Sequence, residues 1–111
     1  MNITEIKIRK LYNEGRLRAL VSIIIDGDFA VHDIKVIEGP NRIFVAMPSR
    51  KEPNGAFRDV THPITAESRK QLEEAVLEEY RNFVEAHAHL SEEELREQLR
   101  QSVQSPDDFN G

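Results

Sequence analysis

With 111 residues, the chain has the length of a single domain that buries one modest hydrophobic core. It has no cysteine, which excludes a disulfide framework, thiolate catalysis and any cysteine-ligated zinc site. No stretch approaches the roughly 18 consecutive apolar residues of a membrane-spanning helix, and the first residues contain no apolar signal region. We therefore expect a globular cytoplasmic protein that has no membrane partner.

The net charge of −5 conceals a division along the chain. Residues 1–60 contain ten Lys or Arg and eight Asp or Glu, whereas residues 61–111 contain five and twelve. Nucleic-acid binding depends on local clusters of cations and not on the total charge, so the first half is where such a surface is expected. An ordinary solvated face explains the same asymmetry equally well.

The first 60 residues show the hydrophobic pattern of β-strands. Residues 4–9 alternate apolar and polar side chains, and residues 16–25 form a longer apolar run rich in β-branched side chains. Gly27 permits the positive φ of a tight hairpin, and Pro48 ends a strand. These signals predict an antiparallel, meander-like sheet of about five strands, which cover residues 4–9, 16–25, 29–37, 42–47 and 57–60.

The second half shows the hydrophobic period of helices. From Thr65, a predicted N-cap, apolar residues recur at helical spacing and predict one long amphipathic helix that covers the sheet. Ser91 and Glu94 form a capping box that begins a short second helix, and the ending SPDDFNG is expected to fray. The result is an α+β fold, with a domain over residues 1–87 and an acidic helical extension over 88–111. The apolar stripe of the second helix consists of Leu95, Leu99 and Val103.

The predicted central strand carries apolar side chains on both of its faces. Leu20 and Ile24 lie on one face, and Val21 and Ile23 lie on the other. One helix covers only one face of a sheet, so a monomer would expose part of this apolar surface. Pairing of two copies would bury it, and we therefore expect a homodimer.

Two segments in the middle of the chain resemble a known family. The run VHDIKVIEG, followed by FVAMPSRKEPNGAFRDVTHPI, is similar to the signature of the stage V sporulation protein G (SpoVG) family of septation proteins. The similarity covers about residues 1–85 and implies a small dimeric α+β bacterial protein. It also implies a nucleic-acid-binding regulator, of DNA and possibly RNA, that is linked to cell division, septum formation and sporulation. Residues 88–111 match no family motif.

The resemblance also implies which cations contact nucleic acid. Arg50 and Lys51 stand side by side on what the sequence predicts to be a loop, and the family's adjacent basic pair in this loop contacts nucleic acid. The remaining candidates are Arg58, just beyond the loop's glycine turn, and Arg69 with Lys70 in the first turns of the long helix. Two further residues modify this prediction. Glu52 subtracts positive potential beside the pair, and Phe57 either stacks on a base or, as we favour, belongs to the core.

Other chemistry has weaker support in the sequence. His32 and Asp33 are neighbours in a predicted strand and point to opposite faces, which makes them a poor catalytic dyad. His87 and His89 are two residues apart and do not share a helix face, so a metal site there is not expected. We expect neither a cofactor nor a small-molecule substrate, and no enzymatic activity. The alternative to a nucleic-acid-binding regulator is a protein-interaction module in septation, in which the acidic helices form the contact surface.

Overall fold

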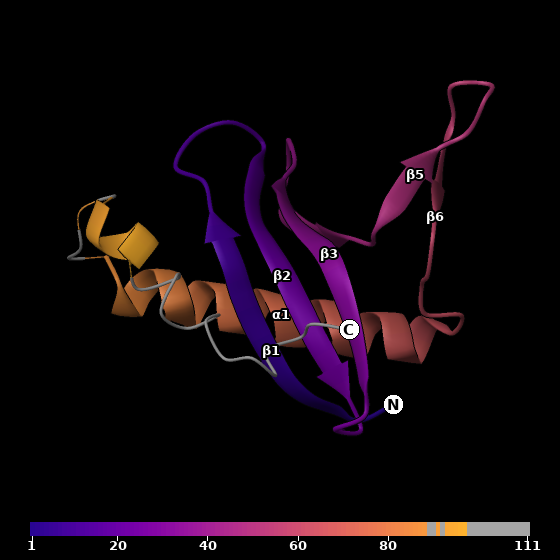
Figure 1. The fold of residues 1–111 in the computed structure, drawn as a ribbon, viewed down its shortest axis with the longest axis horizontal. Helices are drawn as coiled ribbons and strands as arrows, with labels where there is room; N and C mark the ends of the chain where they lie inside the picture. Colours follow the sequence, from indigo (N-terminus) through magenta and orange to yellow (C-terminus); the bar gives the residue numbers. More distant parts are fainter. Residues whose placement is uncertain (89–90, 92, 98–111) are drawn as a thin grey trace.

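The computed structural model describes residues 1–88, 91 and 93–97 of the chain. A four-stranded antiparallel sheet in the order β1-β2-β3-β4 is crossed on one face by a long helix, α1 (Figure 1). A separate two-stranded ribbon, β5-β6, extends from one side of this sheet. The predicted α+β class is therefore confirmed. The strands are β1 (Ile3–Leu11), β2 (Leu17–Ile25), β3 (Phe29–Glu38), β4 (Ile43–Ala46), β5 (Ser49–Lys51) and β6 (Phe57–Asp59), and the helix is α1 (Ala66–Ala86).

The core lies between the sheet and α1. Val21 and Ile23 of β2 are fully buried, as is Val76 of the helix, so the helix stripe covers the face that the hydrophobic period assigned to it. On β2 the residues of the opposite face, Leu20 and Ile24, stay only half-buried. No second layer covers this face among the residues that the structure describes.

The β2–β3 hairpin turns through residues 26–28. Asp26 and Gly27 have φ values of 56° and 68°, positive angles that glycine adopts freely and that aspartate adopts more readily than most other residues. Further along β3, a register shift coincides with a positive φ of 62° at Asp33. This bulge lets Val31 and Ile34, three residues apart, both face the core.

The strand prediction for residues 48–60 is wrong in one respect. Residues 49–51 do not belong to a loop, because they form β5 and pair with β6 in a sheet of their own. Residues 57–59 consequently join this ribbon and not the main sheet. The turn between the strands is closed by Gly55, with φ of 91°, and by the Asn54 side chain, whose Oδ1 accepts a hydrogen bond from the Ala56 amide at 3.0 Å. The six described strands thus form two sheets, where the sequence predicted five in one.

The helix boundaries follow the predicted caps. The Thr65 hydroxyl accepts a hydrogen bond from the Ser68 amide at 3.0 Å and begins α1. In the extension, Ser91 and Glu94 exchange the two bonds of a capping box, at 3.2 and 3.3 Å, and residues 93–97 are helical. Leu95 packs against the core cluster. Leu99, Val103 and the predicted frayed end lie outside the described residues.

Candidate nucleic-acid interface

The β5-β6 ribbon stands clear of the body of the protein, and it carries three of the five predicted contact residues (Figure 1). Its register pairs Arg50 with Arg58 and Lys51 with Phe57. Residues directly opposite each other in an antiparallel pair share one face, and neighbours along a strand point to opposite faces. Arg50 and Lys51 therefore do not form a joint contact on one side. One face of the ribbon presents two arginines, and the other presents a lysine and an aromatic ring.

The arginine face concentrates positive charge, and this charge destabilises the ribbon. Like charges directly opposite each other in a sheet repel each other, so this pair does not contribute to the stability of the ribbon. Arg58 is partly compensated, because its Nε lies 3.3 Å from Oε1 of Glu52. No ion pair of Arg50 is found within the part of the chain that the structure describes. A bound anion would relieve the repulsion, since a guanidinium forks two donors onto a phosphate.

The other face of the ribbon corrects the interpretation of Phe57. Its side chain is 72% exposed, so the favoured assignment to the core is wrong. Within the described part of the chain no layer packs against this two-stranded ribbon, so Phe57 finds no apolar surface there on which to be buried. An exposed aromatic ring beside Lys51 is the arrangement in which single-stranded binding proteins stack a base next to a phosphate contact.

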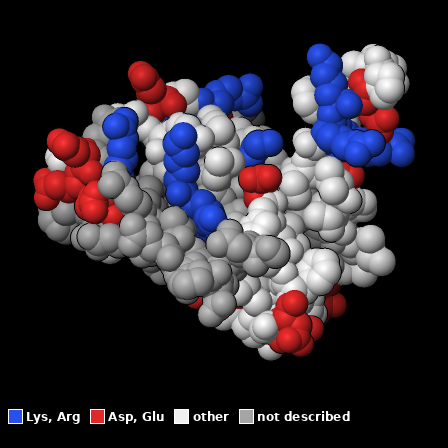
Figure 2. Space-filling view, viewed as in Figure 1, with Lys and Arg blue, Asp and Glu red and all other residues white. Residues whose placement is uncertain are grey.

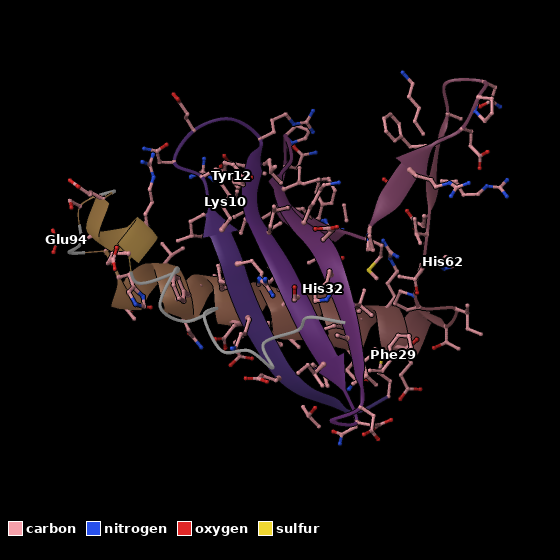
Figure 3. The ribbon with its side chains drawn as sticks, viewed as in Figure 1. Lys10, Tyr12, Phe29, His32, His62 and Glu94 are labelled. Carbon is pink, nitrogen blue, oxygen red and sulfur yellow. The ribbon has the colours of Figure 1, made fainter. Side chains whose placement is uncertain are left out.

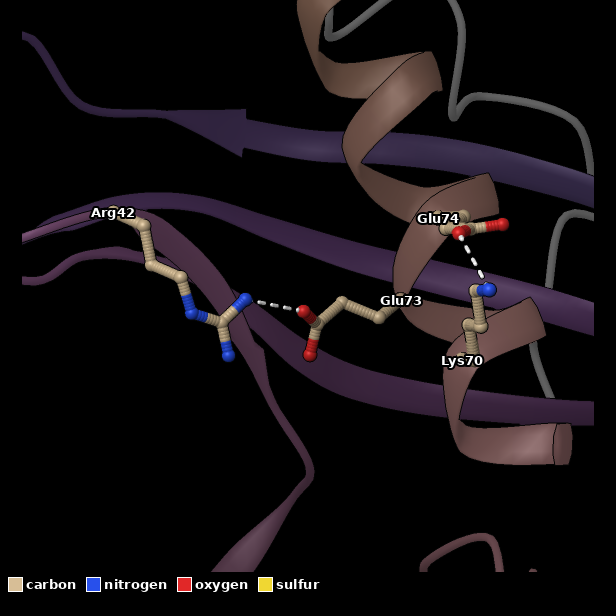
Figure 4. A network of polar contacts seen from close by, with 4 residues as sticks. All are labelled: Arg42, Lys70, Glu73 and Glu74. Carbon is tan, nitrogen blue, oxygen red and sulfur yellow. Dashed lines mark hydrogen bonds and ion pairs between the residues drawn. The ribbon is translucent and has the colours of Figure 1, made fainter. Parts of the chain in front are cut away.

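The remaining two predicted contact residues lie on a different element. Arg69 and Lys70 are exposed in the first turns of α1, and the Lys70 ammonium lies 4.0 Å from the Glu74 carboxylate (Figure 4). A further cation near this helix, Arg42, forms a 2.7 Å ion pair with Glu73. One cation of α1, Lys70, and one cation of the ribbon, Arg58, thus have an acidic partner. The structure brings Arg50, Lys51 and Arg58 together and leaves Arg69 and Lys70 apart from them.

Figure 2 shows how cations are distributed over one face of the molecule. One group covers the ribbon, and a second lies over the end of the sheet where β1 turns toward β2. Uncharged side chains separate the two groups. The sequence pointed to the first group through the family motif but gave no signal for the second.

The described histidines form local hydrogen bonds (Figure 3). His32 Nδ1 lies 2.9 Å from the buried Ser22 hydroxyl, and His62 Nδ1 lies 3.0 Å from the Pro63 carbonyl oxygen. His87 donates its Nδ1 proton to the Phe83 carbonyl at 2.8 Å. Within residues 1–88, 91 and 93–97 no cluster of three or more metal-ligating side chains occurs. His89 is not among the described residues.

An apolar groove that the sequence did not predict lies on the face of the sheet opposite α1. It encloses about 620 Å³ and is lined by residues of β2 and β3 and of the ribbon base, among them Leu20, Phe29 and Val60. Phe29 and Val60 are 63% and 64% exposed. The groove adjoins residues 29–34 of β3, which pair with β2 but not with β4. Exposed apolar side chains here adjoin a strand edge that still has hydrogen-bonding capacity.

No helix of the described residues is both long enough and apolar enough to span a bilayer.

Comparison with known proteins matches this chain to one family. The SpoVG family model matches residues 1–82. A relative from Caldanaerobacter subterraneus subsp. tengcongensis is 56% identical over 80 residues, which cover 72% of this chain and 88% of the relative. A relative from Clostridium perfringens is 55% identical over 80 residues, which cover 72% and 89% of the two chains. A third, from Thermoanaerobacter pseudethanolicus, is 51% identical over 88 residues, which cover 79% and 96%. All three bear the name "Putative septation protein SpoVG". The chain belongs to the SpoVG family.

Proposed function

We propose that this protein is a nucleic-acid-binding regulator that acts in septation, and that the β5-β6 ribbon is its principal contact surface. The observation that carries the proposal is the cross-strand pair of Arg50 and Arg58 on a projecting ribbon. The names of the relatives, which describe septation proteins, support the cellular role.

The dimensions of a two-stranded ribbon suggest how it would bind a duplex. The major groove of B-DNA admits a two-stranded β-ribbon. In that position, the arginine face and the Lys51 face would each meet one wall of the groove, so cations on both sides of the ribbon would contact phosphates. Phosphate contacts position a protein without reading base sequence. The same ribbon offers Phe57 to the unstacked bases of a single strand, so the binding mode extends to RNA loops.

We propose further that the functional unit is a homodimer. The groove lined by Leu20, Phe29 and Val60, together with the unpaired edge of β3, is the surface on which a second copy would be seated. A dimer would bury exposed apolar side chains and present two ribbons to one nucleic acid. Two ribbons raise affinity through effective concentration without any new kind of contact.

A direct test compares two double variants in fluorescence anisotropy with labelled duplex DNA and hairpin RNA. Arg50→Ala/Arg58→Ala removes the arginine face, and we expect affinity to fall at least about tenfold on both probes. Arg42→Ala/Arg81→Ala changes the net charge equally but alters cations away from the ribbon, and we expect it to bind within about twofold of wild type. Equal losses in the two variants would attribute binding to net charge and overturn the assignment to the ribbon.

The second candidate function is a protein-interaction module in septation. It is favoured by the exposed carboxylates of α1, among them Glu74 and Glu78, which lie in the half of the chain that carries the net negative charge. Wild-type protein that binds neither probe at low salt would favour this function over the first.

A further inference from the structure

A second groove lies at the end of the molecule opposite the ribbon (Figures 1 and 3). It encloses about 740 Å³, which is within the range of small-ligand sites. Its walls come from three segments that are distant in the sequence, namely residues 10–18 around the β1–β2 turn, the last turns of α1 and the short helix of residues 93–97. Lys10 and Tyr12 mark its position in Figure 3.

The charge of this groove is opposite to that of the chain. Lys10, Arg18 and Arg96 contribute to its lining, and none of the described lining residues is acidic. The protein as a whole carries a net charge of −5 and twenty Asp or Glu, so a hollow that gathers cations and no described acid favours an anionic ligand over a cationic one.

The cations of the groove stand beside flat aromatic surfaces. Lys10 Nζ lies 5.1 Å from the centroid of the Tyr12 ring, a cation–π contact that orients both side chains. The His87 ring stacks on Phe83 with a centroid distance of 4.1 Å, and the histidine lines the groove. Tyr80 also borders the groove but is only 8% exposed, so the Tyr12 and His87 rings supply the aromatic surface that a ligand can reach.

Arg18 is oriented by the β1–β2 turn. Its Nη1 donates to the Gly15 carbonyl at 3.3 Å, which leaves its other guanidinium donors for a ligand. An oriented guanidinium loses less rotational freedom on binding a phosphate than a mobile side chain does. The groove therefore combines cations, which can bind a phosphate, with aromatic rings, against which a base can stack.

We propose that this groove binds a phosphorylated nucleobase, with the phosphate on Lys10 and Arg18 and the base against the aromatic lining. The ligand is either a free mononucleotide or one nucleotide of a nucleic-acid strand. Part of the wall, Leu95 and Arg96, lies beyond residues 1–82 that the family model matches. The groove is thus completed by the C-terminal extension, which gives that segment a role in binding. The proposal does not depend on nucleic-acid binding by the ribbon.

The test is an NMR titration of ¹⁵N-labelled full-length protein with adenosine 5′-monophosphate. We expect amide shifts at residues 10–13, 84–88 and 95–96, and weaker binding of adenosine or inorganic phosphate alone. A single-stranded adenine pentanucleotide distinguishes the two sources when it is titrated into Arg50→Gln/Lys51→Gln protein, in which the ribbon contacts are weakened. Groove-amide shifts that report affinity at least about tenfold above that of the monophosphate assign the site to a strand, and equal affinity assigns it to a free nucleotide.

Two variants with the same charge change make the test specific. Lys10→Gln/Arg18→Gln should weaken binding of the monophosphate at least about tenfold, while Arg50→Gln/Lys51→Gln, on the ribbon, should leave it unchanged. Thermal unfolding of both variants checks that they remain folded. The proposal is overturned if millimolar monophosphate shifts no groove amides, if both variants bind it equally, or if a pentaglutamate peptide shifts the same amides at lower concentration. None of these outcomes bears on the ribbon, which the DNA and RNA assays test separately.

Discussion

At the scale of single residues, the chain accepts unfavourable local arrangements at a few identifiable positions. Arg50 faces Arg58 across the ribbon, and Asp33 adopts a positive φ within β3. The bulge at Asp33 aligns Val31 and Ile34 toward the core, so its strain is offset by burial. The repulsion within the arginine pair is not offset by burial, since the ribbon buries little apolar surface, and Glu52 compensates only Arg58. This difference is why we assign the arginine pair, and not the bulge, to function.

The positive φ of Asp26, in the β2–β3 turn, gives a stability prediction at this scale. Asp26→Val should lower the free energy of unfolding by about 1–2 kcal/mol, because a β-branched residue resists the φ of 56°. Asp26→Asn should leave it nearly unchanged, because asparagine adopts this conformation readily. Urea denaturation at one fixed protein concentration measures both. A valine variant as stable as wild type would show that the turn relaxes to another type.

At the scale of elements, the sequence predicted the strands and the helix that bury apolar side chains. The alternating period located β1 to β4, and the helical stripe with its Thr65 cap located α1. β5 was missed because Ser49–Lys51 contains no apolar residue, and a strand that buries nothing has no hydrophobic period to detect. Of the candidate site, the family motif pointed to Arg50 and Lys51, and the position of Arg58 near the glycine turn added that residue. The opposite orientations of Arg50 and Lys51 required the pairing with β6 to be known.

The ribbon also gives a prediction about its acidic residue. Glu52→Gln removes the carboxylate that lies 3.3 Å from Arg58, and we expect it to raise affinity for duplex DNA about two- to fivefold. The control is Glu73→Gln, which changes the net charge equally and releases Arg42 outside the ribbon. We expect that control to change affinity by less than about twofold. Equal gains in the two variants would show a general charge effect and no local role for Glu52.

At the scale of the whole molecule, α1 covers one face of the sheet, and no other described element covers the opposite face. The sequence predicted this asymmetry from the two apolar faces of β2. It did not reveal the groove, because Phe29 and Val60 are distant in the chain and meet only after the strands and the ribbon base have folded. The groove lined by Lys10, Arg18 and Arg96 was missed for the same reason, because three segments that are separated in the sequence form its walls.

The open face predicts the oligomeric state. Light scattering at micromolar concentration should give about twice the chain mass of 12.8 kDa. Phe29→Lys should give a folded monomer, because this side chain is 63% exposed within one chain and its replacement leaves the core intact. Val84→Lys, at an exposed apolar position on α1, should remain dimeric. A monomeric wild-type protein would contradict the proposed dimer.

The central claim is that the ribbon binds phosphate, and the salt dependence of binding tests it most directly. Each phosphate neutralised on duplex DNA contributes about 0.9 to the slope of log affinity against log salt concentration. If Arg50 and Lys51 each neutralise one phosphate in both subunits of a dimer, then Arg50→Ala/Lys51→Ala loses about four contacts and its slope should become shallower by about 3.6. The loss should be similar on unrelated DNA sequences. A folded double variant with unchanged affinity and slope would contradict the account and move the contact to Arg69 and Lys70.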